Sequence, residues 1–129
     1  MGNQVSEAFM QALEQAEQTG DAARLVEMFS DDAEVSNLAL KNPLRGREGA
    51  REFWRHYLHQ FDHIHSEFTQ VSETDGKAVL EWEAEGALRG GKPISYRGVT
   101  ILETDRDQVR RFRSYYDSAA FLQPQAQIA

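Results

Sequence analysis

The sequence predicts an α+β fold in which helices come first and a mainly antiparallel sheet follows. Two changes along the chain indicate this order. Up to about residue 61 the apolar residues recur with the period of amphipathic helices, whereas beyond it they alternate as in half-buried strands. Asp and Gly residues typical of hairpins then divide the second half into segments of strand length. Helices followed by a strand meander are the pattern of an α+β domain.

The size and composition favour one soluble domain. The chain has 129 residues, of which 40% are hydrophobic, so we expect a single domain over 1–129 with a frayed tail from about 123. Its formal net charge of −7 disfavours nucleic acid and anionic membrane surfaces as partners. The absence of cysteine excludes disulfides and thiolate sites and is typical of a reducing compartment. With no signal-peptide pattern and no long apolar run, we expect a cytoplasmic protein.

The first helix is predicted from one apolar stripe near the N-terminus. The members of this stripe are Val5, Phe9, Ala12, Leu13 and Ala16. Gly20 would end the helix, and Asp21 would cap a short second helix. The apolar residues that this second helix would bury are Leu25, Val26 and Phe29. A turn is predicted directly afterwards, at residues 30–32.

A short strand at 34–37 and a loop to Gly46 lead to a third helix, predicted from Arg47 to about His59. Its apolar face comprises Ala50, Phe53, Trp54, Tyr57 and, just beyond it, Phe61. His56 and His59 lie off this face, so we expect both to be exposed.

Four extended segments follow the third helix. They cover about 62–73, 77–89, 93–104 and 108–118. In the clearest of them, Leu80, Trp82, Ala84 and Leu88 share one face, and Glu81, Glu83 and Glu85 share the other. The register of the next hairpin stays open: a two-residue loop at Gly90–Gly91 would pair Trp82 with Val99. A three-residue loop would pair Trp82 with Thr100 and leave Tyr96 on its face.

Several short motifs occur together in an order typical of one known fold. They are Gly20-Asp21, Phe29-Ser30-Asp31-Asp32-Ala33, Gly46-Arg47-Glu48 before Phe53-Trp54, Tyr96-Arg97-Gly98-Val99 and Phe112-Arg113-Ser114-Tyr115-Tyr116-Asp117. With them, the chain resembles the nuclear-transport-factor-2-like superfamily from Phe9 to Leu122. This fold is shared by ketosteroid isomerases and SnoaL-type polyketide cyclases. The resemblance implies three N-terminal helices packed in a cone on a strongly bent, mainly antiparallel, cystatin-like sheet.

The resemblance also implies a pocket at the open end of the cone, between the third helix and the concave sheet face. The aromatic residues support it, because they supply more inward ring surface than a small core needs. The expected ligand-binding residues are Trp54, Tyr57, Trp82, Tyr96, Phe112 and Tyr116, together with the polar Asn37 and Ser114. The ligand would be a small, mostly apolar organic molecule. The alternative is that these rings only fill the core.

The resemblance excludes two known activities of this fold. In ketosteroid isomerases an Asp acts as the base, and a Tyr together with a protonated Asp stabilises the oxyanion. Asn37 and Leu13 stand at the base and Tyr positions, and residues 96–102 contain no carboxylate. An amide cannot take up a proton near neutrality. The acid–base relay of limonene epoxide hydrolases is likewise absent.

Asp117 matches the catalytic Asp that SnoaL-type cyclases carry late in the final strand. Strict alternation from Phe112 and Ser114 would point Asp117 outward, but a bulge would turn it inward, and the spacing of Val109 and Phe112 already breaks the period of two. The alternative is that Asp117 caps a turn at 118–120. If Asp117 faces the pocket, proton-transfer chemistry of an isomerase, cyclase or lyase becomes the expected function.

Two further clusters contain residue types that occur in functional sites. His63, His65 and Glu67 have the donor set of an iron site, but alternate residues of one strand project in parallel, so no metal and no cofactor are expected. The outward Glu81, Glu83 and Glu85 could pair with Arg97, Arg111 and Arg113 of neighbouring strands. Relatives of this fold commonly dimerise through that convex face, so we expect a homodimer, and a non-catalytic dimeric adaptor stays open as a function.

Overall fold

The computed structural model describes residues 3–121 and confirms the α+β class. The helices are α1 (Asn3–Thr19), α2 (Ala23–Glu27) and α3 (Gly46–His59). The strands are β1 (Phe29–Asn37), β2 (Leu44–Arg45), β3 (Phe61–Thr74), β4 (Lys77–Leu88), β5 (Pro93–Asp105) and β6 (Gln108–Tyr116), followed by a 3-10 turn, η1 (Ser118–Phe121). None of the helices within residues 3–121 is long and apolar enough to cross a membrane. The tail expected from about residue 123 lies outside the described residues.

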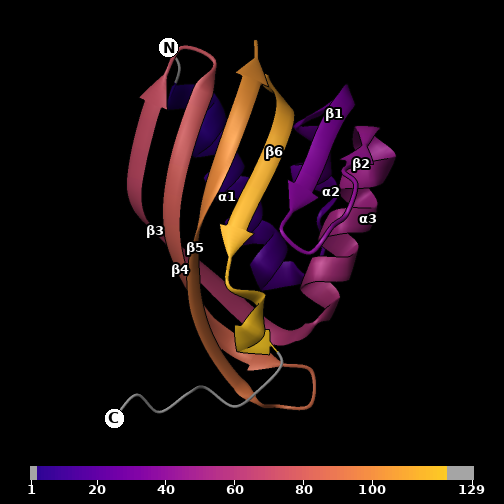
Figure 1. Ribbon diagram of the computed structural model, residues 1–129, viewed down its shortest axis with the longest axis vertical. Coiled ribbons are helices and arrows are strands. Elements are labelled where there is room, and N and C mark those ends of the chain that lie inside the picture. The colour runs from indigo at the N-terminus through magenta and orange to yellow at the C-terminus, as the bar shows by residue number, and fades with distance from the viewer. Residues whose placement is uncertain (1–2, 122–129) are drawn as a thin grey trace.

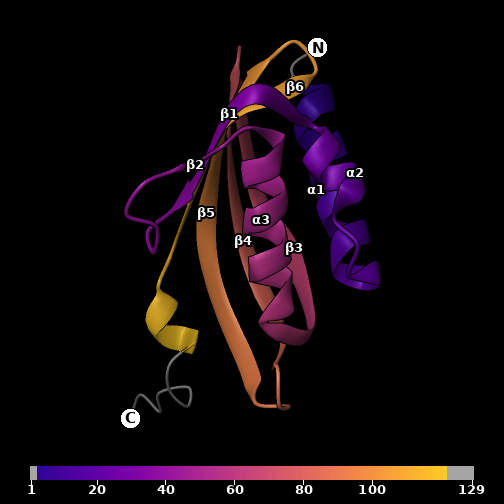
Figure 2. The ribbon, with the colours of Figure 1, turned by 90° about the vertical axis from the view of Figure 1, so that its right-hand side faces the viewer.

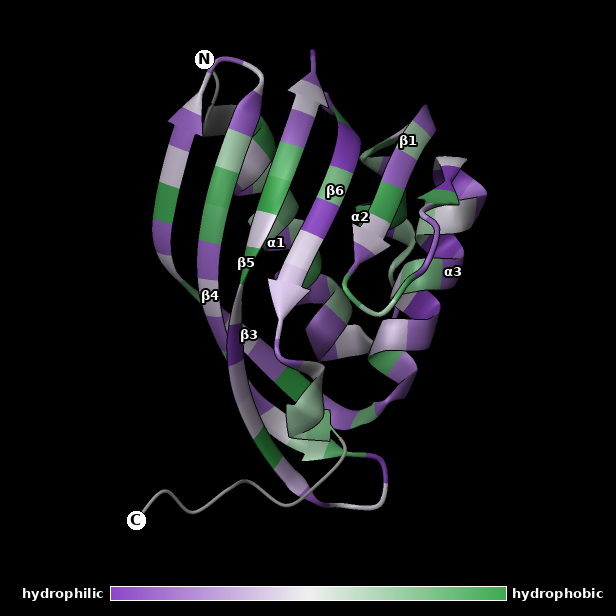
Figure 3. Cartoon of the chain, viewed as in Figure 1, coloured by the Kyte–Doolittle hydropathy of each residue, from purple (hydrophilic) through white to green (hydrophobic). Residues whose placement is uncertain are grey.

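The strands form one curled sheet with the order β2-β1-β6-β5-β4-β3. Neighbouring strands are antiparallel, except that β1 runs parallel to β6. The three helices lie on one side of this sheet, where α3 crosses the concave face (Figure 1, Figure 2). The strands alternate apolar and polar residues along their length, as the period of two predicts (Figure 3). The interior therefore lies between α1, α3 and the concave face.

The predicted helices form, but the turn predicted after α2 is wrong. Gly20, with φ of +79°, ends α1 and donates its N–H to the carbonyl of Ala16, as expected of a C-cap. Residues 30–32 instead belong to β1. β1 begins at Phe29, ahead of the strand predicted at 34–37, because Phe29 pairs with Val109 of β6. A partner strand far along the chain thus overrides the local turn signal.

The β4–β5 hairpin has a register that neither loop interpretation named. Its loop is closed by the Leu88 N–H bonded to the Lys92 carbonyl, and this sets Trp82 opposite Gly98. Trp82 and Tyr96 nevertheless share the inner face, as the longer loop predicted. Gly98 is required there, because a Cβ at this position would lie 2.7 Å from Cζ2 of Trp82.

Aromatic rings fill most of the interior. At its centre the Phe112 ring of β6 has its centroid 5.3 Å from that of Trp54, 5.4 Å from that of Phe53 and 6.0 Å from that of Phe9. A second cluster around Trp82 and Tyr96 packs at the other end of the sheet. Most of the expected rings therefore do form core, and the open space between the two clusters is small.

Candidate functional site

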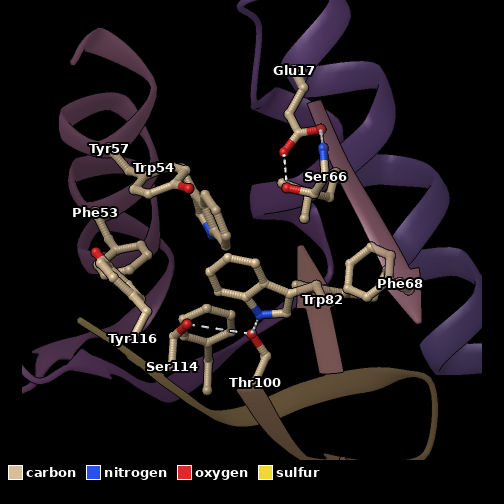
Figure 4. Close-up of a pocket in the computed structure, with 13 residues that line it drawn as sticks. Glu17, Phe53, Trp54, Tyr57, Ser66, Phe68, Trp82, Thr100, Ser114 and Tyr116 are labelled. Carbon is tan, nitrogen blue, oxygen red and sulfur yellow. Dashed lines mark hydrogen bonds between the residues drawn. The ribbon is translucent and has the colours of Figure 1, made fainter. Parts of the chain in front are cut away.

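A small inner cavity lies where the two aromatic clusters meet. It has a volume of about 30 Å³, which is room for one or two water molecules. Its walls come from α1, α3 and the sheet, and the lining residues are Phe9, Leu13, Glu17, Phe53, Trp54, Tyr57, Ser66, Phe68, Trp82, Thr100, Phe112, Ser114 and Tyr116 (Figure 4). Because the cavity has room only for a group of about the size of water, it is much smaller than a pocket that encloses a whole ligand.

Most of the predicted ligand-binding residues lie at this cavity. Trp54, Tyr57, Trp82, Phe112, Ser114 and Tyr116 line it. Asn37 and Tyr96 do not line it, but each contacts a residue that does. The Asn37 amide donates to the Tyr116 hydroxyl over 3.3 Å, and the hydroxyls of Tyr96 and Tyr57 are hydrogen-bonded to each other. These two residues therefore position the tyrosines from outside the cavity.

Asp117 is the exception, because the structure leaves it outside the cavity. It is exposed, and its Oδ1 accepts the Ala119 N–H over 2.9 Å, so it caps η1. The expected bulge exists, since Thr104 pairs with Val109 and Glu103 with Arg111. However, this bulge precedes Phe112, and the alternation from Phe112 to Tyr116 then continues unbroken. Of the two alternatives for Asp117, the structure therefore shows the cap of the turn at 118–120 and not the inward residue.

The carboxyl group that does line the cavity is Glu17, which the sequence reasoning missed. It lies in the last turn of α1, where Oε1 accepts the Ser66 backbone N–H over 2.9 Å and Oε2 accepts the Ser66 hydroxyl over 2.6 Å. Burial raises the pKa of Glu17 above its ordinary 4.5, although both hydrogen bonds and the charge of His65 oppose this. A signal was present, because Glu17 follows Leu13 by four residues and so continues the apolar stripe of α1.

The indole nitrogens of the two tryptophans differ in their partners. Trp82 Nε1 donates to Thr100 Oγ1 over 2.9 Å. Trp54 is only 4% exposed, and its Nε1 has no hydrogen-bond partner among the described residues. Leaving a buried donor unpaired costs about 1–3 kcal/mol. Trp54 therefore offers the cavity a free N–H group.

The three tyrosines around the cavity act as neutral hydroxyl groups. Burial raises the pKa of Tyr57, of Tyr96 and of Tyr116 above the ordinary value for a phenol. None of the three can ionise near neutrality, so they can donate or accept hydrogen bonds but cannot serve as bases. Within the cavity lining, Glu17 is the side chain able to exchange a proton.

A larger open groove adjoins the inner cavity at the mouth of the cone. This mouth groove has a volume of about 730 Å³. Its lining residues are Asn37, Ala39, Leu40, Leu44, Glu52, Phe53, Arg55, His56, Tyr57, His59, Gln60 and Tyr116. It shares Phe53, Tyr57 and Tyr116 with the inner cavity, so these three side chains stand between the two spaces.

The outer sheet face carries the remaining candidates. Glu81, Glu83 and Glu85 are exposed there, as are His63, His65 and Glu67. Within residues 3–121 no group of three or more His, Asp or Glu side chains is arranged to hold a metal ion. Arg97 stands opposite Glu83 in register, but Arg111 and Arg113 bind Glu103 instead, at 3.5 and 2.9 Å.

Solved structures of low sequence identity share this fold. An NTF2-like protein from Anabaena variabilis is 21% identical and has a TM-score of 0.82, with 91% of this chain and 90% of that chain covered. A protein with a ketosteroid isomerase-like fold from Catenulispora acidiphila, in complex with trimethylamine, is 17% identical with a TM-score of 0.78, covering 95% of this chain and 92% of that chain. An LEH-like epoxide hydrolase from M. tuberculosis is 16% identical with a TM-score of 0.70, covering 92% and 88%. At these identities the likeness concerns the fold alone.

Comparison with curated proteins found no match. A family model for the SnoaL-like domain, in contrast, matches residues 7–112. The matched span runs from α1 into β6 and includes Glu17, Trp54 and Trp82 of the inner cavity. It covers well over half of the chain, and the fold agrees with it. The chain therefore belongs to the SnoaL-like domain family.

Proposed function

We propose that this protein binds a small, mostly apolar organic molecule, whose body lies in the mouth groove and whose polar tip enters the inner cavity. The observation that carries this proposal is the free N–H of Trp54, because a buried donor without a partner is costly unless a ligand or a water completes it. The aromatic rings of the cavity lining supply apolar contact for the rest of the ligand tip.

The volumes of the two spaces support a ligand whose body lies in the mouth groove and whose tip lies in the inner cavity. The mouth groove, at about 730 Å³, lies within the range of small-molecule sites, whereas the inner cavity, at about 30 Å³, accepts only a tip. The tip would pass between Tyr57 and Tyr116, which border both spaces.

The proposal is tested by a thermal-shift screen of a metabolite library. A ligand present at about 100 times its dissociation constant stabilises the folded protein by about 2.7 kcal/mol. Trp54→Phe should abolish most of that stabilisation, because it removes the free donor. Trp82→Phe is the matched control, since its N–H is already bonded to Thr100 within the protein. A library without any stabilising compound, or equal losses in the two variants, would contradict the proposal.

Proton-transfer catalysis is a second candidate, and the observation that favours it is Glu17. A carboxyl group whose pKa is raised by burial is suited to acid–base work closer to neutrality. Its place at the inner cavity makes Glu17, in preference to the exposed Asp117, the residue to test. Once a ligand is identified, Glu17→Gln should abolish its conversion and retain its binding. Conversion that persists in this variant would remove the enzymatic candidate.

A further inference from the structure

Two opposite walls of the inner cavity present hydrogen-bonding groups of opposite kinds. On α3, the buried Trp54 Nε1–H is a donor without a partner among the described residues. On α1, the Glu17 carboxylate is an acceptor. Ser66 occupies one acceptor position on each Glu17 oxygen, and a carboxylate has about four such positions, so capacity remains. Figure 4 shows Glu17 and Ser66 on one side of the cavity and Trp54 on the other.

The sheet floor of the cavity adds a second donor. Thr100 Oγ1 accepts the N–H of Trp82 and lies 3.3 Å from Ser114 Oγ. Only one of these two hydroxyls can donate to the other, so the second hydroxyl retains a proton for a group in the cavity. The lining of the cavity therefore carries donors from Trp54 and from the Thr100–Ser114 pair, and an acceptor from Glu17.

The cavity has room for only one or two water molecules, so a ligand can place one polar group in it, and the donors and the acceptor of the walls together select that group. A carbonyl oxygen accepts from Trp54 but turns its lone pairs toward the Glu17 carboxylate. An ammonium group donates to Glu17 but has no lone pair for Trp54. A hydroxyl group accepts with its two lone pairs and donates with its proton, so it satisfies both walls.

We propose that the inner cavity is a hydroxyl subsite, which selects an alcohol or phenol among small apolar ligands. The subsite rests on the proposed function, because the hydroxyl would be the tip of the ligand in the mouth groove. In the free protein the same position has room for a water molecule. Trp54 and Glu17 are then the residues that determine specificity.

The ionisation of Glu17 sets the condition under which this selection operates. The ionised carboxylate accepts a hydrogen bond from the ligand hydroxyl. The protonated carboxyl is itself a donor, so it can also bind a carbonyl oxygen. The groups that face Glu17 are His65 on β3, whose positive charge favours the ionised form, and Glu14 on α1, whose negative charge opposes it. The nearby Tyr57 and Tyr96 stay neutral. Selection for a hydroxyl group should therefore strengthen as the pH rises through the pKa of Glu17.

The test is calorimetric titration at about pH 8 with three probes that share one apolar ring: cyclohexanol, cyclohexanone and cyclohexylammonium. Cyclohexanol should bind at least about tenfold more tightly than either other probe. In Glu17→Gln the preference over cyclohexanone should fall toward onefold, because the amide N–H can donate to a carbonyl. In Trp54→Phe both oxygen probes should weaken together. The control Glu7→Gln changes an exposed carboxylate on α1 that is not among the groups facing Glu17, and it should leave the preference unchanged.

The outcomes separate the subsite from the broader function. A preference for cyclohexanone or cyclohexylammonium, or a preference that Glu17→Gln leaves intact, overturns the hydroxyl subsite. Failure of all three probes to bind would show a cavity that holds water only, and it also overturns the subsite. The proposed function falls on a different result, namely a metabolite library that contains no ligand.

Discussion

The carboxyl group of Glu17 should make the folded protein lose stability as the pH rises. Burial raises its pKa in the folded state above the ordinary value of 4.5, so the folded protein holds this proton more tightly than the unfolded chain. The stabilisation is therefore complete below about pH 4.5 and is lost as the pH rises through the folded-state pKa. Glu17→Gln keeps the shape of the side chain and cannot titrate, so it should remove this loss.

The expected magnitude follows from proton linkage and from the contacts of Glu17. Within the window between the two pKa values, one proton changes the free energy of unfolding by up to about 1.4 kcal/mol per pH unit. The two hydrogen bonds from Ser66 and the charge of His65 stabilise the ionised form, so they make the window narrower than burial alone would. The difference in free energy of unfolding between wild type and Glu17→Gln should accordingly shrink across this window and stay level above it.

The assay is urea denaturation at a series of values from about pH 4 to about pH 8. Subtracting the variant curve from the wild-type curve cancels the titration of groups common to both proteins. Glu7→Gln serves as the control, because Glu7 is an exposed residue of the same helix. Its difference in free energy of unfolding from wild type should not change with pH. A difference for Glu17→Gln that is flat, or that grows with pH, would refute the assignment of Glu17 as a carboxyl group penalised by burial.

Three other changes test neighbouring parts of the structure. Gly98→Ala should destabilise the fold by about 1–3 kcal/mol in chemical denaturation, because the new methyl would lie 2.7 Å from the Trp82 ring; an unchanged midpoint would show that β5 can shift freely. Asp117→Ala should cost at most about 1 kcal/mol through its lost cap and leave ligand binding unchanged in calorimetry, whereas lost binding would return Asp117 to the site. We expect a homodimer through the convex face, where Tyr115 is 40% exposed and stands opposite Val99 in register. Tyr115→Glu should yield monomers in sedimentation, and a monomeric wild type at micromolar concentration would exclude this assembly.

The sequence by itself determined the helices, the strand segments and the faces of most core residues. These features depend on the local period of apolar residues, so the stripe of α1, the face of α3 and the alternation of β4 could be predicted without any partner. The same periodicity indicated most of the cavity lining, including Trp54, Trp82 and Phe112, because each lies on an inward face of its own element.

Tertiary structure decided the features that depend on two distant segments. Pairing of Phe29 with Val109 converted a predicted turn into strand, and the closure of the β4–β5 loop set Trp82 against Gly98. The polar character of the site was decided in the same way, since Glu17 meets Ser66 from 49 residues away. Backbone hydrogen bonds between strands and close contacts between layers form only when both partners are in place, and no local pattern records that geometry. For this reason the inward faces were predictable, whereas the buried carboxylate, the free indole N–H and the small size of the cavity emerged only from the folded chain.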